Sequence, residues 1–278
     1  MKKIFLVFFG LLALASIRSQ TAADATVLYD FLKFADSKKL SSLPVGERIA
    51  KIATFFKDSP YVGSTLEVSQ TEQLQVNLRQ FDCNTFVENV LALNVLLDQE
   101  RRDWFHFKQV LEVIRYRDGY VHGYPSRLHY ASDWLHDNVA KAFFDWVLVP
   151  ELEVPFRPSV NYMSTHPAAY PALRTNANLV SEIQTRELEI NTWSMHYIPK
   201  ARIKANALFL QTGDVVAITT NLAGLDFSHM GIVVRKKGKV YLLHASSTEK
   251  KVVLSKQTLS DYLAGIKKHT GVVAVRPK

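Results

Sequence analysis

The chain has 278 residues, of which 47% are hydrophobic, and carries a net charge of +8 with a single cysteine. Its positive charges are spread along the chain rather than gathered with aromatic residues into a stripe, so we expect no nucleic-acid partner. One cysteine excludes an internal disulfide, which leaves either a buried inert thiol or a thiol kept for its reactivity.

The first nineteen residues have the features of a secretory signal peptide. Two lysines precede an apolar run from Ile4 to Ala15, and the stretch from Ser16 to Ser19 supplies a cleavage region. The run is shorter than the roughly 20 residues that span a bilayer. We therefore predict a signal peptide over residues 1–19, export to the periplasm or beyond, no membrane span after its removal, and one catalytic domain over residues 20–278.

Helical spacing dominates the first part of the mature chain. Apolar residues three and four apart predict two helices between Thr21 and Lys57, a third from about Cys83 to Leu97, and a fourth from Trp104 to Arg115. Asp82 stands at the N-cap position of the third helix.

The middle and the end of the chain differ in pattern. Residues 117–200 are rich in Tyr, Trp, His and Pro, and only Ser132 to Phe144 is predicted as a helix there. Irregular stretches of this length are usually functional. Later, β-branched runs between turn residues predict strands, and these are Leu208–Leu210, Val215–Thr219, Met230–Val234, Val240–His244, Val252–Leu254 and Val272–Val275, with a helix from Ser260 to Lys268. Helices followed by antiparallel strands indicate an α+β fold.

Cys83 is the first candidate for chemistry. It stands in the opening turn of a predicted helix, directly after the N-cap Asp82. The unpaired N–H groups and positive dipole end of a helix stabilise a thiolate, so this position predicts a lowered pKa and a nucleophile. A structural cysteine would more often lie mid-helix on the apolar face.

Two histidines are the candidates for the base that a thiol nucleophile needs. His229 begins one predicted strand and His244 ends the next, and the turn at 236–238 makes the two strands an antiparallel hairpin. The start of one strand then lies beside the end of the other, which predicts neighbouring imidazoles. Ordinary rim histidines and a Cys/His/His zinc site are the alternatives, and the spacing lacks the close pairs typical of zinc.

Motifs around these residues resemble known families. In chain order, residues 60–63, 81–87, 212–216, 228–233 and 243–245 resemble the motifs of NlpC/P60 cysteine peptidases. Over nearly the whole mature chain, the sequence resembles the narrower DUF1460 branch, which consists of N-acetylmuramoyl-L-alanine amidases. That resemblance is carried by residues 115–119, 126–130, 133–134, 163–167, 224–229, 244–247 and 261–263.

The resemblance implies a papain-like NlpC/P60 fold, with N-terminal helices packed on an antiparallel sheet and a large family-specific insertion at about 117–200. It implies Cys83 as nucleophile, His229 as general base and later acid, and His244 as the residue that orients His229. Tyr61 matches a tyrosine that helps to stabilise the oxyanion beside the Cys83 N–H. It implies no metal or organic cofactor.

The same resemblance implies the substrate, a muropeptide fragment of peptidoglycan with the 1,6-anhydro sugar, cut between N-acetylmuramic acid and L-Ala. A γ-D-glutamyl-diamino acid endopeptidase and a non-catalytic cell-wall-binding module are the alternatives. Aromatic side chains stack on sugars and Arg pairs with carboxylates, although aromatic residues here are as well explained by core packing. The candidate substrate-binding residues are Asp82, Arg127, His129, Tyr130, Trp134 and Ser228.

Overall fold

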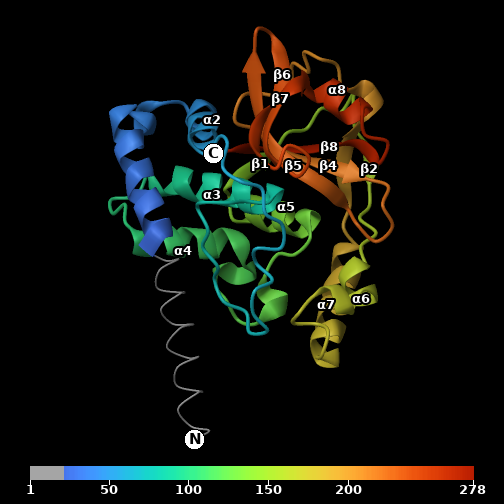
Figure 1. The fold of residues 1–278 in the computed structure, drawn as a ribbon. Helices are drawn as coiled ribbons and strands as arrows, with labels where there is room; N and C mark the ends of the chain where they lie inside the picture. Colours follow the sequence, from blue (N-terminus) through green and yellow to red (C-terminus); the bar gives the residue numbers. More distant parts are fainter. Residues whose placement is uncertain (1–21) are drawn as a thin grey trace, which may run out of the picture.

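Helices from the first part of the chain pack against a sheet from its last part (Figure 1). The computed structural model describes residues 22–278, and the predicted signal peptide lies outside them. The helical layer holds a helix over residues 22–37, α2 (Val45–Phe55), α3 (Cys83–Leu96) and α4 (Trp104–Arg115). The predicted bounds of α4 are confirmed, and α3 ends one residue before the prediction.

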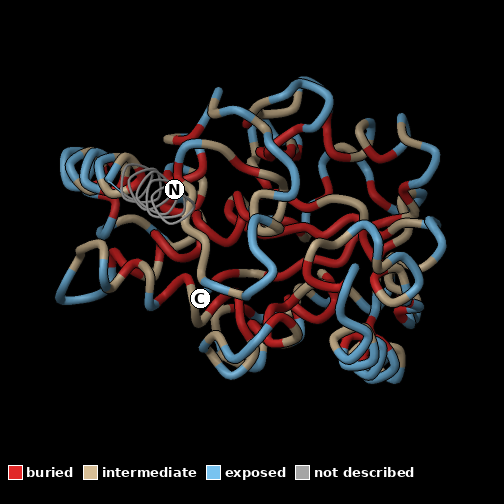
Figure 2. The backbone as a smooth tube through the Cα atoms, turned by 60° about the horizontal axis from the view of Figure 1, so that its bottom comes forward, coloured by how far each residue is buried: buried red, intermediate tan, exposed pale blue. Residues whose placement is uncertain are grey.

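The central helix of this layer is α3. Its residues are buried almost continuously from Thr85 to Leu96, because α2 and α4 pack against it from the helical side and β5 and β6 from the sheet side. Figure 2 shows the same distribution: buried backbone runs through the middle of the molecule, and exposed backbone forms the outer loops. Because α3 is packed between helices and sheet, its first residue, Cys83, is held in a fixed place.

The sheet is antiparallel at every recorded pairing, with strand order β2-β3-β8-β4-β5-β6-β7 and β1 paired to β8. Apolar side chains cover both of its faces, and α8 packs against β6, β7 and β8. The α+β prediction is therefore confirmed. The strands and the last helix are β1 (Phe144–Trp146), β2 (Val154–Phe156), β3 (Met195–Pro199), β4 (Val215–Thr220), β5 (Phe227–Lys236), β6 (Lys239–Ser246), β7 (Lys251–Thr258), β8 (His269–Pro277) and α8 (Leu259–Ala264).

The turn before β4 is where α2 meets the sheet. A Cβ on Gly46 would lie 2.2 Å from the Thr212 carbonyl oxygen, and Gly213 has φ +93° and would place a Cβ 2.3 Å from the Gly46 Cα. Only glycines permit this approach of two backbones. Asp214 then holds the turn by accepting from the Gln211 N–H at 2.7 Å and from the Arg276 guanidinium at 2.8 Å.

The middle segment corrects several predictions. The predicted helix from Ser132 to Phe144 is α5 (Ala131–Ala140), and Phe144 instead begins β1. Two helices there, α6 (Tyr162–Thr165) and α7 (Ala177–Ile190), were not predicted. The segment also adds strands β1, β2 and β3 to the main sheet, so part of it belongs to the same core as α3 and β5.

The strand predicted at Leu208–Leu210 is wrong, because these residues form a turn in which Leu208 is exposed. The Arg235 guanidinium donates to the carbonyls of Asn206, Ala207 and Leu210. A side chain thus satisfies carbonyl groups that a strand would have paired with a neighbour. Within residues 22–278, no helix has the length and apolar character to cross a membrane.

Candidate active site

The start of α3 is held by reciprocal hydrogen bonds. The Asp82 carboxylate accepts from the Thr85 backbone N–H at 2.8 Å, and the Asp82 N–H donates to the Thr85 hydroxyl at 3.0 Å. This capping box satisfies two backbone groups that would otherwise lack partners. The predicted N-cap is therefore confirmed, and it fixes Cys83 in the first turn of the helix.

Cys83 is half-buried, and its thiol opens onto a cleft of about 340 Å³. Burial and then the Asp82 carboxylate raise the pKa of Cys83 to about 12, although the backbone N–H groups of Met230, Cys83 and Asn84 oppose the shift. The helix start was expected to lower this pKa. The expectation is wrong for the free protein, because desolvation of a thiolate and a neighbouring negative charge outweigh the helix dipole.

The two candidate histidines are direct neighbours. His229 Nε2 lies 2.6 Å from His244 Nδ1, and the rings are edge-to-face with centroids 4.8 Å apart. Burial lowers the pKa of His229 well below its ordinary value, with positive charge on His244 adding to the effect, and burial alone lowers the pKa of His244 to about 4. Both rings are therefore neutral at pH 7, and they share one proton along their hydrogen bond.

The contact between His229 and His244 depends on Gly231. A Cβ on Gly231 would lie 2.9 Å from the His244 Cβ and 2.8 Å from Leu242 Cδ1 on the neighbouring strand. Because β5 and β6 pair with Ile232 opposite Leu243, Gly231 lies opposite His244. Glycine at this position leaves room for the imidazole to reach His229.

Tyr262 on α8 packs against this pair, and it carried no assigned role in the sequence. Its ring lies 5.4 Å from the His244 ring, 6.2 Å from the His229 ring and 5.6 Å from the His269 ring. Burial, and secondarily negative charge on Cys83, raise the pKa of Tyr262 to about 12. The tyrosine thus shields one side of the histidine pair with a neutral ring. Its place in the motif 261–263 was the available signal.

Most of the predicted site residues line the cleft that holds the thiol. Cys83 and His229 both line this cleft, together with five of the six predicted substrate residues and the loop before α3. The predicted residues on its wall are Asp82, Arg127, His129, Tyr130 and Ser228, and unpredicted ones are Glu67, Asn84, Tyr170 and Asp226. Glu67 lies in an irregular loop, where no sequence pattern marks it.

Arg127 has carboxylate partners within the protein. It is 4% exposed, donates to Glu67 Oε1 at 2.5 Å and lies 3.5 Å from Glu72 Oε1. Tyr116 donates to the same Glu72 oxygen at 2.6 Å. The sequence suggested that Arg127 pairs with a carboxylate of the substrate. In the free protein, the charge of Arg127 is instead compensated by carboxylates in the loop of residues 64–75.

His129 and Tyr130 are part of the cleft wall and are hydrogen-bonded to protein groups. A ring nitrogen of His129 lies 2.9 Å from the Tyr124 carbonyl oxygen, and Tyr130 donates to Glu187 at 2.7 Å. Trp134 is different. It is fully buried, packs against Phe144 at a ring distance of 5.6 Å and does not line the cleft, so it belongs to the core.

A buried carboxylate ties the middle segment to the start of β5, the strand that carries His229. Asp226 accepts from the Ser132 N–H at 2.8 Å and from the Ser132 hydroxyl at 2.6 Å. Burial raises the pKa of Asp226, and these hydrogen bonds oppose the shift. Asp226 lies three residues before His229, so the contact fixes the entry into β5. Ser228, between them, has a buried hydroxyl with no partner among the described residues.

Tyr61 lies beside the thiol without lining the cleft. It pairs with Phe81 through an isolated parallel bridge just before α3, and it is half-buried. Burial raises the pKa of Tyr61, and negative charge on Cys83 and Asp82 adds to the shift. The phenol is therefore a neutral donor near Cys83. Within the described residues, no group of three or more His, Cys, Asp or Glu has an arrangement that could hold a metal ion.

Comparison with known proteins connects this site to a family. The AmiA-like family, described as N-acetylmuramoyl-L-alanine amidase-like, matches residues 51–272. No curated protein matches the chain. An N-acetylmuramoyl-L-alanine amidase from Bacteroides uniformis ATCC 8492 is 39% identical, with a TM-score of 0.80 over 84% of this chain and 99% of that one.

Two further solved structures are similar. A putative xylanase from Bacteroides fragilis is 40% identical, with a TM-score of 0.77 over 82% of this chain and 99% of that one. A DUF1460 protein from Legionella pneumophila str. Philadelphia 1 is 20% identical and shares the fold, with a TM-score of 0.68 over 95% of this chain and 96% of that one. The resemblance found in the motifs is thus confirmed, and the chain belongs to the AmiA-like family of N-acetylmuramoyl-L-alanine amidase-like proteins.

Proposed function

We propose that this protein is a cysteine amidase that hydrolyses the bond between N-acetylmuramic acid and L-Ala in peptidoglycan fragments. The observation that carries the proposal is that Cys83 and His229 line one cleft, with His229 hydrogen-bonded to His244. Membership in the amidase-like family and the name of the Bacteroides uniformis structure support the choice of bond. The arrangement of helix and hairpin supports a papain-like NlpC/P60 fold.

The hydrogen bond between the histidines determines which nitrogen acts as base. His229 Nε2 is engaged with His244 Nδ1, so His229 Nδ1 is the nitrogen left for the thiol proton. For Nδ1 to accept, Nε2 carries the hydrogen and donates it to His244, which therefore holds its own proton on Nε2. His244 thus orients His229 and stabilises the imidazolium that forms.

The raised pKa of Cys83 dictates the timing of proton transfer. A thiol with a pKa of about 12 beside a histidine whose pKa is lowered does not form a resting ion pair. The proton therefore moves to His229 as sulfur attacks the lactyl carbonyl carbon. Tyr61 and the Cys83 N–H donate to the developing oxyanion, and both are neutral donors.

Collapse of the tetrahedral intermediate completes the first half of the reaction. The carbon–nitrogen bond breaks, His229 gives its proton to the departing L-Ala nitrogen, and a thioester remains on Cys83. Water then attacks the thioester with His229 as base, which releases the lactyl carboxylate and restores the thiol.

The cleft suits a sugar as the acyl part. Its wall combines the rings of His129, Tyr130 and Tyr170 with the polar groups of Asn84 and Ser228. Rings stack on sugar faces, and polar groups select hydroxyls. We propose N-acetylmuramic acid in its 1,6-anhydro form as the occupant, and a protein exported through residues 1–19 to meet such fragments.

Mass spectrometry of digested anhydro-muropeptides tests the proposal, with Cys83→Ala as the inactive control. The expected products are the intact sugar and a peptide that begins at L-Ala. An L-Ala-D-Glu stub left on the sugar would identify an endopeptidase instead. A wild-type protein that binds the fragments without cutting them would identify a binding module.

A further inference from the structure

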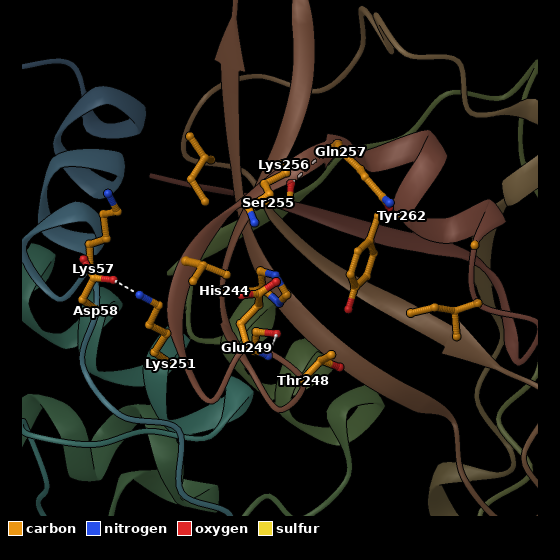
Figure 3. A pocket seen from close by; sticks show the side chains of 15 residues that line it. Lys57, Asp58, His244, Thr248, Glu249, Lys251, Ser255, Lys256, Gln257 and Tyr262 are labelled. Carbon is orange, nitrogen blue, oxygen red and sulfur yellow. Dashed lines mark hydrogen bonds and ion pairs between the residues drawn. The ribbon is translucent and has the colours of Figure 1, made fainter.

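A second cavity lies beside the histidine pair. This groove, of about 670 Å³, is lined by His244 and Tyr262 together with residues of β7 and the chain that follows α2. Figure 3 shows His244 at its centre, Lys57 and Lys251 on one side, and Lys256 and Gln257 on the other. His244 bonds His229, which lines the cleft, and the Tyr262 ring of the groove packs against both imidazoles, so cleft and groove adjoin at the histidine pair.

The groove is lined by more cationic than anionic groups. Three lysines contribute to it, against the carboxylates of Asp58 and Glu249. Lys251 is paired with Asp58 at 2.5 Å, whereas Lys57 and Lys256 have no carboxylate partner among the described residues. Both of these lysines are exposed, so their ammonium groups are available to a ligand.

The cleft has the opposite balance. Glu67, Asp82 and Asp226 line it with a single arginine, and that arginine is already paired with Glu67. An acidic ligand would meet repulsion there and attraction in the groove. A neutral sugar has no such conflict with the cleft.

The order of the catalytic groups assigns a direction to the substrate. The nucleophile Cys83 lies in the cleft, and His229, which protonates the leaving nitrogen, is the residue bonded to His244 at the groove. The acyl part bonded to sulfur therefore occupies the cleft side. The amine part departs beside the His229 ring, and the Tyr262 ring of the groove packs next to that imidazole.

We propose that the groove is the subsite for the leaving peptide and recognises its carboxylates through Lys57 and Lys256. The peptide released by this reaction is acidic, because the stem carries the free α-carboxylate of D-Glu and a carboxylate at its C-terminus. Glu249 supplies a partner for the ammonium group of a diamino acid. The inference rests on the proposed amidase function and adds the location and charge of the leaving-group site.

Two measurements on the double variant Lys57→Gln/Lys256→Gln test the groove assignment. The control is Lys239→Gln, because Lys239 is an exposed lysine at the start of β6 and outside the groove. The first compares kcat/KM for an anhydro-muropeptide with a tetrapeptide stem and for the same compound with amidated carboxylates. The second is calorimetric titration of the free tetrapeptide. Exposed lysine–carboxylate pairs are individually weak, so we expect the double change to weaken binding about five- to tenfold.

The wild type and the control should bind the free tetrapeptide and prefer the acidic substrate, and the double variant should lose about that factor in both assays. Equal wild-type turnover of the two substrates, or an unchanged preference in the double variant, would overturn the groove assignment while leaving the amidase intact. If no substrate is cut, the amidase proposal fails. The titration then still decides the groove, because unchanged tetrapeptide binding in the double variant would overturn it.

Discussion

Two regions of the molecule build the same cleft in different ways. The frame made of α3 and the β5–β6 hairpin places Cys83, His229 and His244 through regular backbone geometry and a capping box. The middle segment, residues 117–200, contributes Arg127, His129 and Tyr130, and the side chains of Arg127 and Tyr130 are held by contacts to residues 60 and 57 positions away. Local geometry therefore positions the proposed chemistry, whereas long-range ion pairs and hydrogen bonds shape the wall. Substitutions in the two regions should fail differently.

The largest effect is expected at the frame. Cys83→Ala removes the nucleophile and should lower muropeptide turnover by at least about 10⁴-fold. The fold should persist, because the capping box joins Asp82 and Thr85 and leaves the thiol unused. Turnover assays together with thermal unfolding check this. Retained activity would assign the chemistry to another group.

The next effect separates orientation from proton transfer. His244→Ala removes the acceptor for His229 Nε2 and should lower kcat by about 10²- to 10⁴-fold. His244→Asn supplies an amide oxygen as acceptor and should retain more activity than His244→Ala. His196→Ala, at an exposed histidine on β3, is the matched control. Equal activity in all three variants would remove His244 from the site.

The middle segment should lose stability instead. Arg127→Met leaves the largely buried carboxylates of Glu67 and Glu72, whose side chains are 17% and 5% exposed, without their cation, and losing one partner of a buried ion pair typically costs about 3–5 kcal/mol of unfolding free energy. Arg102→Met breaks a more exposed pair with Asp36 and should cost about 1 kcal/mol or less. Denaturant unfolding measures both. If Arg127→Met keeps wild-type stability and raises only KM, the arginine binds substrate after all.

The smallest effect concerns the thiol itself. Because burial and Asp82 raise the pKa of Cys83 to about 12, its iodoacetamide alkylation should be slow at pH 7 and rise steadily with pH. A raised pKa keeps the thiol protonated through neutral pH, so no plateau of reactivity should appear near pH 5 or 6. Asp82→Asn should accelerate alkylation at neutral pH about severalfold. A low-pH plateau would reveal a resting thiolate–imidazolium pair.

The sequence predicted the frame well because its cues are local. A cap residue marks the start of α3, and a turn between two β-branched runs marks the hairpin, so the approach of His229 and His244 followed from strand geometry. The shifted pKa of Cys83 did not follow, since it depends on how much of the fold closes over the thiol.

The middle segment was harder for a physical reason. The partners of Arg127 lie about sixty residues away in an irregular loop, and no spacing rule connects them. The helix α7 did carry a signal, since Asn176 caps it and Leu179, Ile183 and Ile190 follow a helical face, but the surrounding irregular sequence masked it. Trp134 was indistinguishable from a sugar-stacking residue until its burial was known.

The protonated state of Cys83 also bears on chemical durability. Peroxide and disulfide exchange attack thiolates, so a thiol held neutral by burial and by Asp82 is a poor target for both. With a single cysteine in the chain, no second thiol could trap a sulfenic acid as an internal disulfide and allow its later reduction. Oxidation of Cys83 would thus be difficult to reverse. A thiol that is deprotonated only during attack on the substrate would be oxidised slowly, so the enzyme would stay active longer in an oxidising compartment.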